Sequence, residues 1–133
     1  MEPFYDREGR VVGWLHPDNI VVDGARQCRA FVQDGDVYNL KGGYLGEFRR
    51  GFLWDQSGAA VGFVRDAAGG PPKPPTRLPP LPPLVRIPRV RLFPSAPAPR
   101  VSLCREWSSQ TFDAFLGGEE HAEAASMAVQ RSA

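Results

Sequence analysis

The chain has 133 residues with a formal charge of +1, and 42% hydrophobic against 23% charged residues are enough for one small folded domain with an additional tail. No run of 18 apolar residues occurs and charged residues are spread through the first 20 positions, so the sequence predicts neither a membrane span nor a secretory signal and favours a cytoplasmic protein. Cys28 and Cys104 stand far apart without a C-x-x-C pair, which argues against a disulfide framework or a structural zinc site.

Charge and proline content divide the chain into parts. Residues 1–66 hold 8 basic and 10 acidic residues, residues 67–105 hold 7 basic residues and no acidic one, and the remainder has 5 acidic residues against 1 basic. Twelve of the 14 prolines lie between Pro71 and Pro99, where they exclude helix interiors and central strands. We therefore expect a folded domain at 1–66, a basic proline-rich arm at 67–105, a short docking helix at 106–118 and a disordered tail at 119–133.

Four segments of the first part align without gaps at a period of 16 to 17 residues. They read PFYDREGRVVGWL, IVVDGARQCRAFV, DVYNLKGGYLGEF and FLWDQSGAAVGFV. In each segment an Asp or Asn follows an apolar pair and stands seven positions before a small residue. The Asp and Asn positions are Asp6, Asp23, Asn39 and Asp55, and the small ones are Gly13, Ala30, Gly46 and Gly62.

Each repeat is predicted to be a β-hairpin, because the unit is too short for two helices and has turn chemistry at its centre. An Asp or Asn that opens a turn accepts hydrogen bonds from the backbone ahead of it, and a glycine three positions later supplies a positive φ. Gly9, Gly42 and Gly58 occupy that position. The second repeat has Arg26 there and Gly24 earlier, so we expect its turn to differ.

Four hairpins must share a core, because a single hairpin is marginal in water. A closed ring satisfies this and removes exposed sheet edges. The expected fold is therefore all-β, with four β-hairpin repeats closed into a small propeller-like or barrel-like ring, followed by a polyproline II arm and a short C-terminal helix. The small residues should mark close backbone approach. The bulk of the core is expected from Tyr5, Val22, Tyr38 and Trp54, together with Leu15, Val32, Phe48 and Val64.

A resemblance to a known family rests on these segments. The runs YDREGRVVGWL, VYNLKGGYLGEF and LWDQSGAAVGFV, followed by the proline-rich stretch and WSSQTFDAFL, resemble the bacterial proteins described as four-fold β-flowers, over residues 3 to about 117. The resemblance implies a fold and no assigned activity. The second repeat departs from the pattern at Arg26 and Ala30, which implies imperfect fourfold symmetry.

The arm repeats an apolar residue at every third position, the period of a polyproline II helix. This stripe should lie against a protein surface, which is the arm's own domain, a second subunit or a partner. Arg77, Pro80 and Pro83 also match the R-x-x-P-x-x-P ligand of SH3 domains. The candidate partner-binding residues are Arg77, Leu78, Pro80, Leu81, Pro83, Leu84, Ile87, Val90 and Phe93.

The seven cations of the arm leave an alternative, which is binding of nucleic acid or another anionic ligand. Aromatic side chains that would stack on bases are missing from the arm apart from Phe93, and the acidic parts on either side oppose such a ligand. Protein binding or self-association is therefore the favoured use of the arm.

Beyond the arm, Trp107 to Gly117 is predicted to form a helix of two turns. Ser108 is the expected cap, and Gly117 the stop. Phe112, Phe115 and Leu116 would form one apolar face. Such a short helix needs tertiary contacts, and docking on the chain's own domain is favoured over docking on a partner.

Signals for chemistry are weak. Asp6, Asp23, Asn39 and Asp55 would bring four oxygen donors around one axis, as a cation site requires, but the turn role explains them without a metal. His16 and His121 have no evident Ser or Cys partner, and no phosphate loop, nucleophile elbow or HExxH occurs. We expect no catalytic, cofactor or metal residue. The sequence favours a non-enzymatic interaction or assembly module, with an anionic-ligand binder and a small enzyme with an unrecognised site as alternatives.

Overall fold

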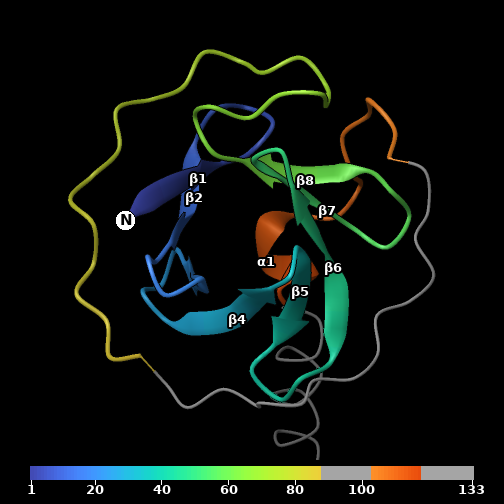
Figure 1. Cartoon of the computed structure of the whole chain (residues 1–133). Helices are drawn as coiled ribbons and strands as arrows, with labels where there is room; N and C mark the ends of the chain where they lie inside the picture. The colour runs from blue at the N-terminus through green and yellow to red at the C-terminus, as the bar shows by residue number, and fades with distance from the viewer. Residues whose placement is uncertain (88–102, 118–133) are drawn as a thin grey trace, which may run out of the picture.

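Eight antiparallel strands form a closed barrel in which each strand pairs with the next in sequence and β8 returns to β1. The computed structural model describes residues 1–87 and 103–117. Figure 1 looks along the barrel, with the strands arranged around the helix α1. The elements are β1 Glu2–Tyr5, β2 Val11–Leu15, β3 Ile20–Asp23, β4 Cys28–Gln33, β5 Asp36–Asn39, β6 Tyr44–Arg49, β7 Phe52–Trp54, β8 Ala60–Phe63 and α1 Phe112–Phe115.

The four repeats are four hairpins, as predicted: β1–β2, β3–β4, β5–β6 and β7–β8. The Asp or Asn at each turn uses Oδ1 to accept the backbone N–H groups two and four residues ahead, at 2.8 to 3.0 Å. Since strands run up and down in turn, these four turns gather at one end of the barrel, which we call the turn end.

The second turn does not differ from the others, so the prediction based on Arg26 is wrong. Arg26 itself adopts a positive φ of 65°, where the other repeats have Gly9, Gly42 and Gly58. Its turn also keeps the shared bonds, from Ala25 and Gln27 N–H to the Asp23 carboxylate. A positive φ costs a non-glycine residue about 1–2 kcal/mol. The two hydrogen bonds to Asp23 are worth a comparable amount, so the side chain at the first turn position decides the conformation.

Every hairpin carries a β-bulge at the same place, where the partner strand inserts one extra residue. Along the first strand of each hairpin, successive side chains point alternately inward and outward. The inward residues Phe4, Val21, Val37 and Leu53 are fully buried in one cluster, which we call the inner core, together with Val64 and partly buried Leu15, Val32 and Phe48.

Tyr5, Val22, Tyr38 and Trp54 are buried as predicted, but they lie outside this inner core. Tyr5 and Trp54 pack in one outer cluster with Phe52 and Phe63. Val22 and Tyr38 pack in a second outer cluster with Trp14, Ile20 and Phe31. The barrel wall therefore has apolar side chains packed on both its inner and its outer face. The sequence pattern predicts one common core for these residues.

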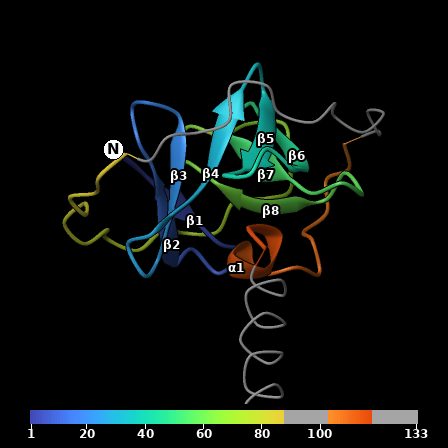
Figure 2. The ribbon, with the colours of Figure 1, turned by 90° about the horizontal axis from the view of Figure 1, so that it is seen from below.

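The helix α1 closes the turn end of the barrel (Figure 2). Its buried side chains Phe112 and Phe115, with Leu116 after it, belong to the inner core, so the predicted face and its docking on the same chain are confirmed. The small residues make room for it: a Cβ on Gly13 would stand 2.6 Å from the Phe112 ring, and one on Gly46 would stand 2.9 Å from the Phe115 ring.

Two details of the predicted helix are wrong. The helix is a single turn, capped by the Thr111 hydroxyl, which accepts the Ala114 N–H at 3.1 Å. Ser108 instead donates its hydroxyl hydrogen to the carboxylate of Asp55. The tertiary partner outcompetes the local cap because Asp55 is ionised and charge-assisted hydrogen bonds are stronger than neutral ones. Gly117 ends the helix with φ 96°, as expected.

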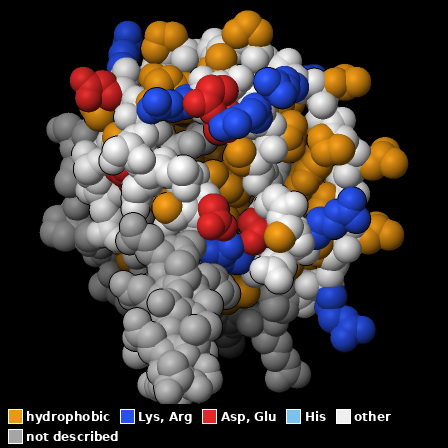
Figure 3. Space-filling model, turned by 180° about the vertical axis from the view of Figure 1, so that it is seen from behind, with side chains coloured by type: hydrophobic (Ala, Val, Ile, Leu, Met, Phe, Trp, Pro, Cys, Tyr) orange, Lys and Arg blue, Asp and Glu red, His pale blue; other side chains and the backbone are white. Residues whose placement is uncertain are grey.

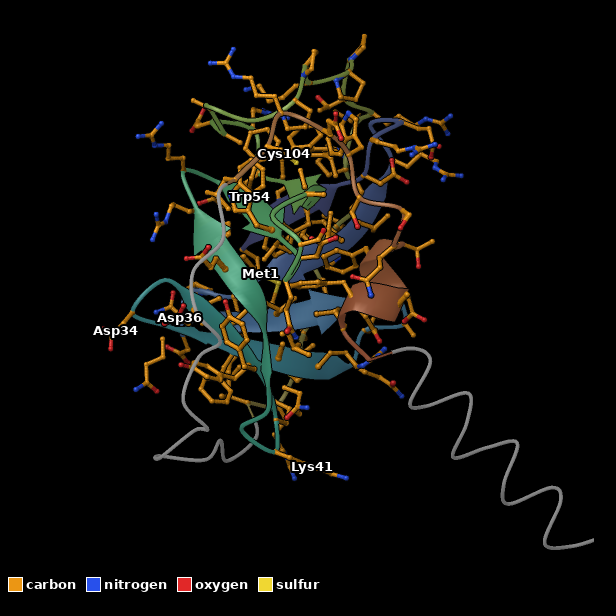
Figure 4. All side chains as sticks on the ribbon, turned by 90° about the vertical axis from the view of Figure 1, so that its right-hand side faces the viewer. Met1, Asp34, Asp36, Lys41, Trp54 and Cys104 are labelled. Carbon is orange, nitrogen blue, oxygen red and sulfur yellow. The ribbon has the colours of Figure 1, made fainter. Side chains whose placement is uncertain are left out.

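Residues 103–108 fill a gap where the barrel closes. β1 and β8 share a single pair, Tyr5 with Phe63. Beyond it, Ala60 donates its N–H to Glu106 O at 2.9 Å and accepts the Ser108 N–H at 2.7 Å, in a parallel bridge with Trp107. Leu103 and Trp107 pack on the outer cluster of Trp54, on the side seen in Figure 4 with Trp54 and Cys104 labelled.

Candidate functional site

The arm lies on its own barrel. From β8 it passes around the outside, on the side of β1 and β2 (Figure 1), and residues 64–87 form neither helix nor strand. Arg77 donates its backbone N–H to Gly9 O at 3.0 Å, and the Cys28 thiol lies 3.6 Å from Arg86 O. Val85 packs on the outer cluster of Trp14. The arm is thus fixed at both ends of the segment that carries its leucines.

Those leucines point away from the barrel. Leu78, Leu81 and Leu84 are 93%, 89% and 102% exposed, and we call this row the leucine ladder. Their spacing of three residues places them on one face of the arm. Ile87, the next residue of the predicted stripe, is only 36% exposed. The stripe therefore does not serve to hold the arm on its own domain.

The remaining candidate residues fall into different surroundings. Arg77 and Pro80 are exposed, whereas Pro83 is buried. The three residues of the R-x-x-P-x-x-P motif are therefore not all available to a partner while the arm is docked. Val90 and Phe93, like the predicted tail at 119–133, lie outside the described residues.

The surroundings of the ladder are cationic. Arg77 precedes it, Arg86 follows it, and both are exposed. Residues 67–87 contain no acidic residue. In the space-filling view, hydrophobic side chains project from the right-hand edge, where the arm runs, with Lys or Arg side chains among them (Figure 3). The ladder is thus a convex apolar ridge with positive charge at its two ends.

A second candidate site is a cavity of about 540 Å³ at the turn end, between the first two hairpin turns and residues 107–113. Val12, Val61 and Phe112 line its apolar part. Around its mouth Arg10 pairs with Asp6 at 3.0 Å and with Glu8 at 2.5 Å. Figure 3 looks at this end, where acidic and basic side chains stand beside hydrophobic surface. The charged groups are thus paired with one another around the cavity.

Arg29 is a key residue at this end that sequence reasoning missed. It is the extra residue of the second bulge, and the other three hairpins have Val12, Leu45 and Val61 at that position. Its side chain is 8% exposed and its Nη1 lies 2.8 Å from Asp23 Oδ2 and 2.9 Å from Asp113 Oδ1. Nη2 donates to Leu116 O at 3.2 Å. The aligned repeats could have indicated it, because Arg29 is the one cation at a position that is apolar in the other three.

Arg29 therefore ties α1 to the second hairpin. Burial alone would lower the pKa of Arg29, but its hydrogen bonds and the charges of Asp113 and Asp23 outweigh burial and raise the pKa above the usual value. Asp113 is 68% exposed, so the pair with Asp23, whose side chain is 6% exposed, is the energetically important one. The guanidinium also satisfies a carbonyl at the helix end.

Each of the four turn residues is hydrogen-bonded within its own turn. The Oδ1 atoms of all four accept backbone N–H groups of their own turns, and the remaining carboxylate oxygens face Arg10, Arg29 and the Ser108 hydroxyl. Among the described residues no group of three or more His, Cys, Asp and Glu side chains could hold a metal ion. This supports the turn role of Asp6, Asp23, Asn39 and Asp55.

Besides Arg29, four described side chains have shifted pKa values, each with a local cause. Burial raises the pKa of the Cys28 thiol and of the Tyr38 hydroxyl. Hydrogen bonding to Asp6 raises the pKa of Arg10. Burial by itself raises the pKa of Asp55, but hydrogen bonds from Ser108 and Ser57 outweigh it and hold the pKa below its ordinary value. Each of these shifts moves the pKa farther from neutrality, so none of these groups is poised to exchange protons at pH 7.

These features define a class of protein: a small closed barrel of four hairpins, with one end filled by a helix of the same chain. A sequence profile described as 4-fold beta flower protein matches residues 2–116. The chain therefore belongs to the 4-fold beta flower family. No curated protein and no solved structure matches it significantly. Within the described ranges, no helix has the length and apolar character needed to cross a membrane.

Proposed function

We propose that this chain is a non-enzymatic protein-binding or assembly module, which presents the leucine ladder to a partner protein. The observation that carries the proposal is the nearly complete exposure of Leu78, Leu81 and Leu84 on an arm that is itself docked. Burying one leucine side chain is worth about 1.5–3 kcal/mol. Burial of these three leucines by a partner would therefore contribute a favourable free energy of binding that folding of the chain does not use.

The docked arm also suits binding by its rigidity. An extended proline-rich segment loses little conformational entropy when it binds, and anchoring at Arg77 and Arg86 reduces that loss further. We place this activity in the bacterial cytoplasm, because the free thiols of Cys28 and Cys104 suit a reducing compartment.

The alternative of an anionic ligand is less well supported. Exposed leucines gain nothing from phosphate, and the described arm has no aromatic side chain to stack on a base. The alternative of an enzyme has the cavity at the turn end as its best location. Its charged groups are already engaged in ion pairs, and the shifted pKa of Arg10 lies far from neutrality.

The test compares three baits in the native host's lysate after nuclease treatment. The full chain is compared with the variant Leu78→Ser/Leu81→Ser/Leu84→Ser, which should keep the melting temperature because these side chains contact solvent. Gln27→Ser/Gln33→Ser, changed at two exposed positions elsewhere on the barrel, is the matched control. We expect a protein that the full chain and the control retain and the leucine variant loses. Equal retention by all three baits would refute the proposal.

A further inference from the structure

We infer that the partner is a protein with a concave apolar groove bordered by carboxylates, and that it binds the ladder only while the arm is docked on the barrel. This inference rests on the proposed function and names the chemistry of the partner. It is carried by the shape and charge of the ladder and by the environments of the three motif residues.

The positive charge beside the leucines favours a partner with a negatively charged surface. Exposed Arg77 and Arg86 bracket Leu78 to Leu84, and residues 67–87 include a further cation, Lys73, and no acidic side chain. Lys73 donates a hydrogen bond to Arg65 O at 3.0 Å and lies five residues before the ladder, so the two arginines are the cations nearest to the leucines in sequence. A guanidinium pairs best with a carboxylate, which it can bind through two parallel hydrogen bonds. Carboxylates at the rim of the groove would fix the direction in which the arm lies.

Shape and charge oppose the pairing of two ladders in a dimer. Two ladders packed about a twofold axis would oppose two convex ridges and bring the arginines of both copies together. The three leucines supply on the order of 300 Å² of apolar surface, against about 800 Å² that each partner buries in a stable interface. A concave partner reaches the missing area by also touching the exposed prolines of the arm and the barrel beside it.

The docked arm also excludes the binding mode of a free R-x-x-P-x-x-P peptide. That mode needs Arg77, Pro80 and Pro83 on one accessible face, but Pro83 is buried. The backbone N–H of Arg77 is bonded to Gly9 O, and a Cβ on Gly9 would stand 2.1 Å from Pro75 O. The arm fits closely on the first hairpin turn. The outward face is thus the leucine face, and the barrel holds it in place.

An anionic membrane is the competing surface for leucines flanked by cations. Interfacial segments commonly add Trp or Phe on the apolar face, and residues 67–87 contain no aromatic residue. A protein groove is therefore favoured, and the membrane is an outcome of the test.

The experiment places a photo-crosslinking amino acid at position 81 of the full chain in native-host cells, with position 33 as the control site. We expect a crosslink to one protein from position 81 alone, with the crosslinked segment lining an apolar groove that carries Asp or Glu. The same chain is mixed with sedimenting vesicles of phosphatidylserine and phosphatidylcholine, where we expect no binding.

Binding to the purified partner then tests the leucines, the arginines and the docked arm separately. The variant Leu78→Ser/Leu81→Ser/Leu84→Ser should bind at least about thirtyfold more weakly, as expected for central apolar anchors. Arg77→Gln/Arg86→Gln should weaken binding about tenfold at low salt and flatten its salt dependence. Val85→Asp, which removes an arm contact to the barrel, and a synthetic peptide of residues 71–87 should each bind at least about tenfold more weakly, because the arm is no longer held in place.

The outcomes separate the inference from the proposed function. A partner that depends on the leucines but binds the peptide as well as the full chain, or ignores both arginines, would overturn the inference and leave the protein-binding function standing. The absence of any crosslink specific to position 81, or leucine-dependent sedimentation with the vesicles, would overturn both.

Discussion

At the residue scale, the turns depend on the side chain that opens them more than on the glycine that follows. Arg26 and Gly9 adopt similar positive φ values, 65° and 79°. Asp23 and Asp6 each bind two backbone N–H groups ahead of them. The repeat therefore tolerates a non-glycine residue at the fourth position, provided that the opening carboxylate or amide is kept.

In the third repeat, glycine is required at the later small position, although the second repeat has Ala30 there. A Cβ on Gly46 would stand 2.0 Å from Trp54 O and 2.9 Å from the Phe115 ring. We expect Gly46→Ala to lower the free energy of unfolding by about 1–3 kcal/mol, because the strand and α1 must move apart. Urea denaturation would measure it. Gly24→Ala is the control, since the nearest atom to a Cβ there is Val12 O at 3.3 Å and Gly24 is exposed. Equal stability of the Gly46 variant and the natural chain would contradict the packing of α1.

Ser108 should make stability depend on acid pH. Its hydroxyl and that of Ser57 hold the pKa of Asp55 below the ordinary value, against the opposing effect of burial. The unfolded chain has an Asp pKa of about 3.9, so this stabilisation is complete above that pH and is lost as pH falls through the lower pKa of the folded protein.

The variant Ser108→Ala removes one of these bonds, so it should lose about 1–2 kcal/mol at pH 7. It should also lose less further stability than the natural chain as the pH falls below about 4. Denaturation at a series of pH values measures both effects, and Ser109→Ala, at an exposed neighbour, is the control. Parallel acid profiles for the Ser108 variant and the natural chain would count against this assignment.

At the element scale, α1 owes its existence to tertiary contacts. One helical turn is far below the length that is stable alone in water. Its stability comes from Phe112 and Phe115 in the inner core and from the contacts of Arg29. The second hairpin thus differs from the other three in holding the helix through Arg29, which breaks the fourfold symmetry of the repeats.

We expect Arg29→Leu to lower the free energy of unfolding by about 3–5 kcal/mol, because it leaves the buried carboxylate of Asp23 without its cation. The double variant Arg29→Leu/Asp23→Asn should recover most of that loss. This combination is the one found in the third hairpin, where Asn39 opens the equivalent turn and Leu45 is the extra residue of the bulge. Thermal unfolding of the three chains would measure this, and a double variant as unstable as the single one would disprove the charge explanation.

The inner face of α1 provides a second prediction at this scale. Phe112→Ala should cost about 3–5 kcal/mol, because it leaves a cavity among Phe4, Gly13 and Gly62. Asp113→Asn, on the exposed side of the same helix, should cost less than 1 kcal/mol. Chemical denaturation would measure the free energy of unfolding of both variants. Similar losses for the two would mean that this face of the helix is not docked in the inner core.

At the scale of the whole molecule, closure of the barrel is the weakest part of the sheet. β1 and β8 share one pair, while residues 103–108 complete the rest of that side. We expect hydrogen exchange to be faster for the amides of Ala60 and Ser108 than for those in the middle of the β4–β5 ladder, because this seam has a single strand pair to break and that ladder has four. Exchange measured by NMR would decide it, and equal protection at both places would mean that the barrel opens only by global unfolding.

Much of the architecture follows from the sequence by itself. The repeat predicts four hairpins because an Asp or Asn turn and a small residue recur at fixed spacing, and closure follows because a hairpin alone cannot bury its apolar residues. The apolar face of Phe112, Phe115 and Leu116 is likewise a local pattern, so its docking could be foreseen. The R-x-x-P-x-x-P motif can also be read from the sequence, but the burial of Pro83 cannot.

The tertiary structure alone decides how these parts are oriented. Phe4 and Tyr5 point to opposite faces of β1, and both faces are buried, which divides one predicted core into inner and outer layers. Ser108 bonds to Asp55, 53 positions away, and Arg29 bonds to Asp113, 84 positions away. The same holds for the arm: its period of three predicts a stripe, but which face meets the barrel depends on the shape of the surface beneath it. Contacts between distant segments settle that choice, and they leave Leu78, Leu81 and Leu84 facing outward.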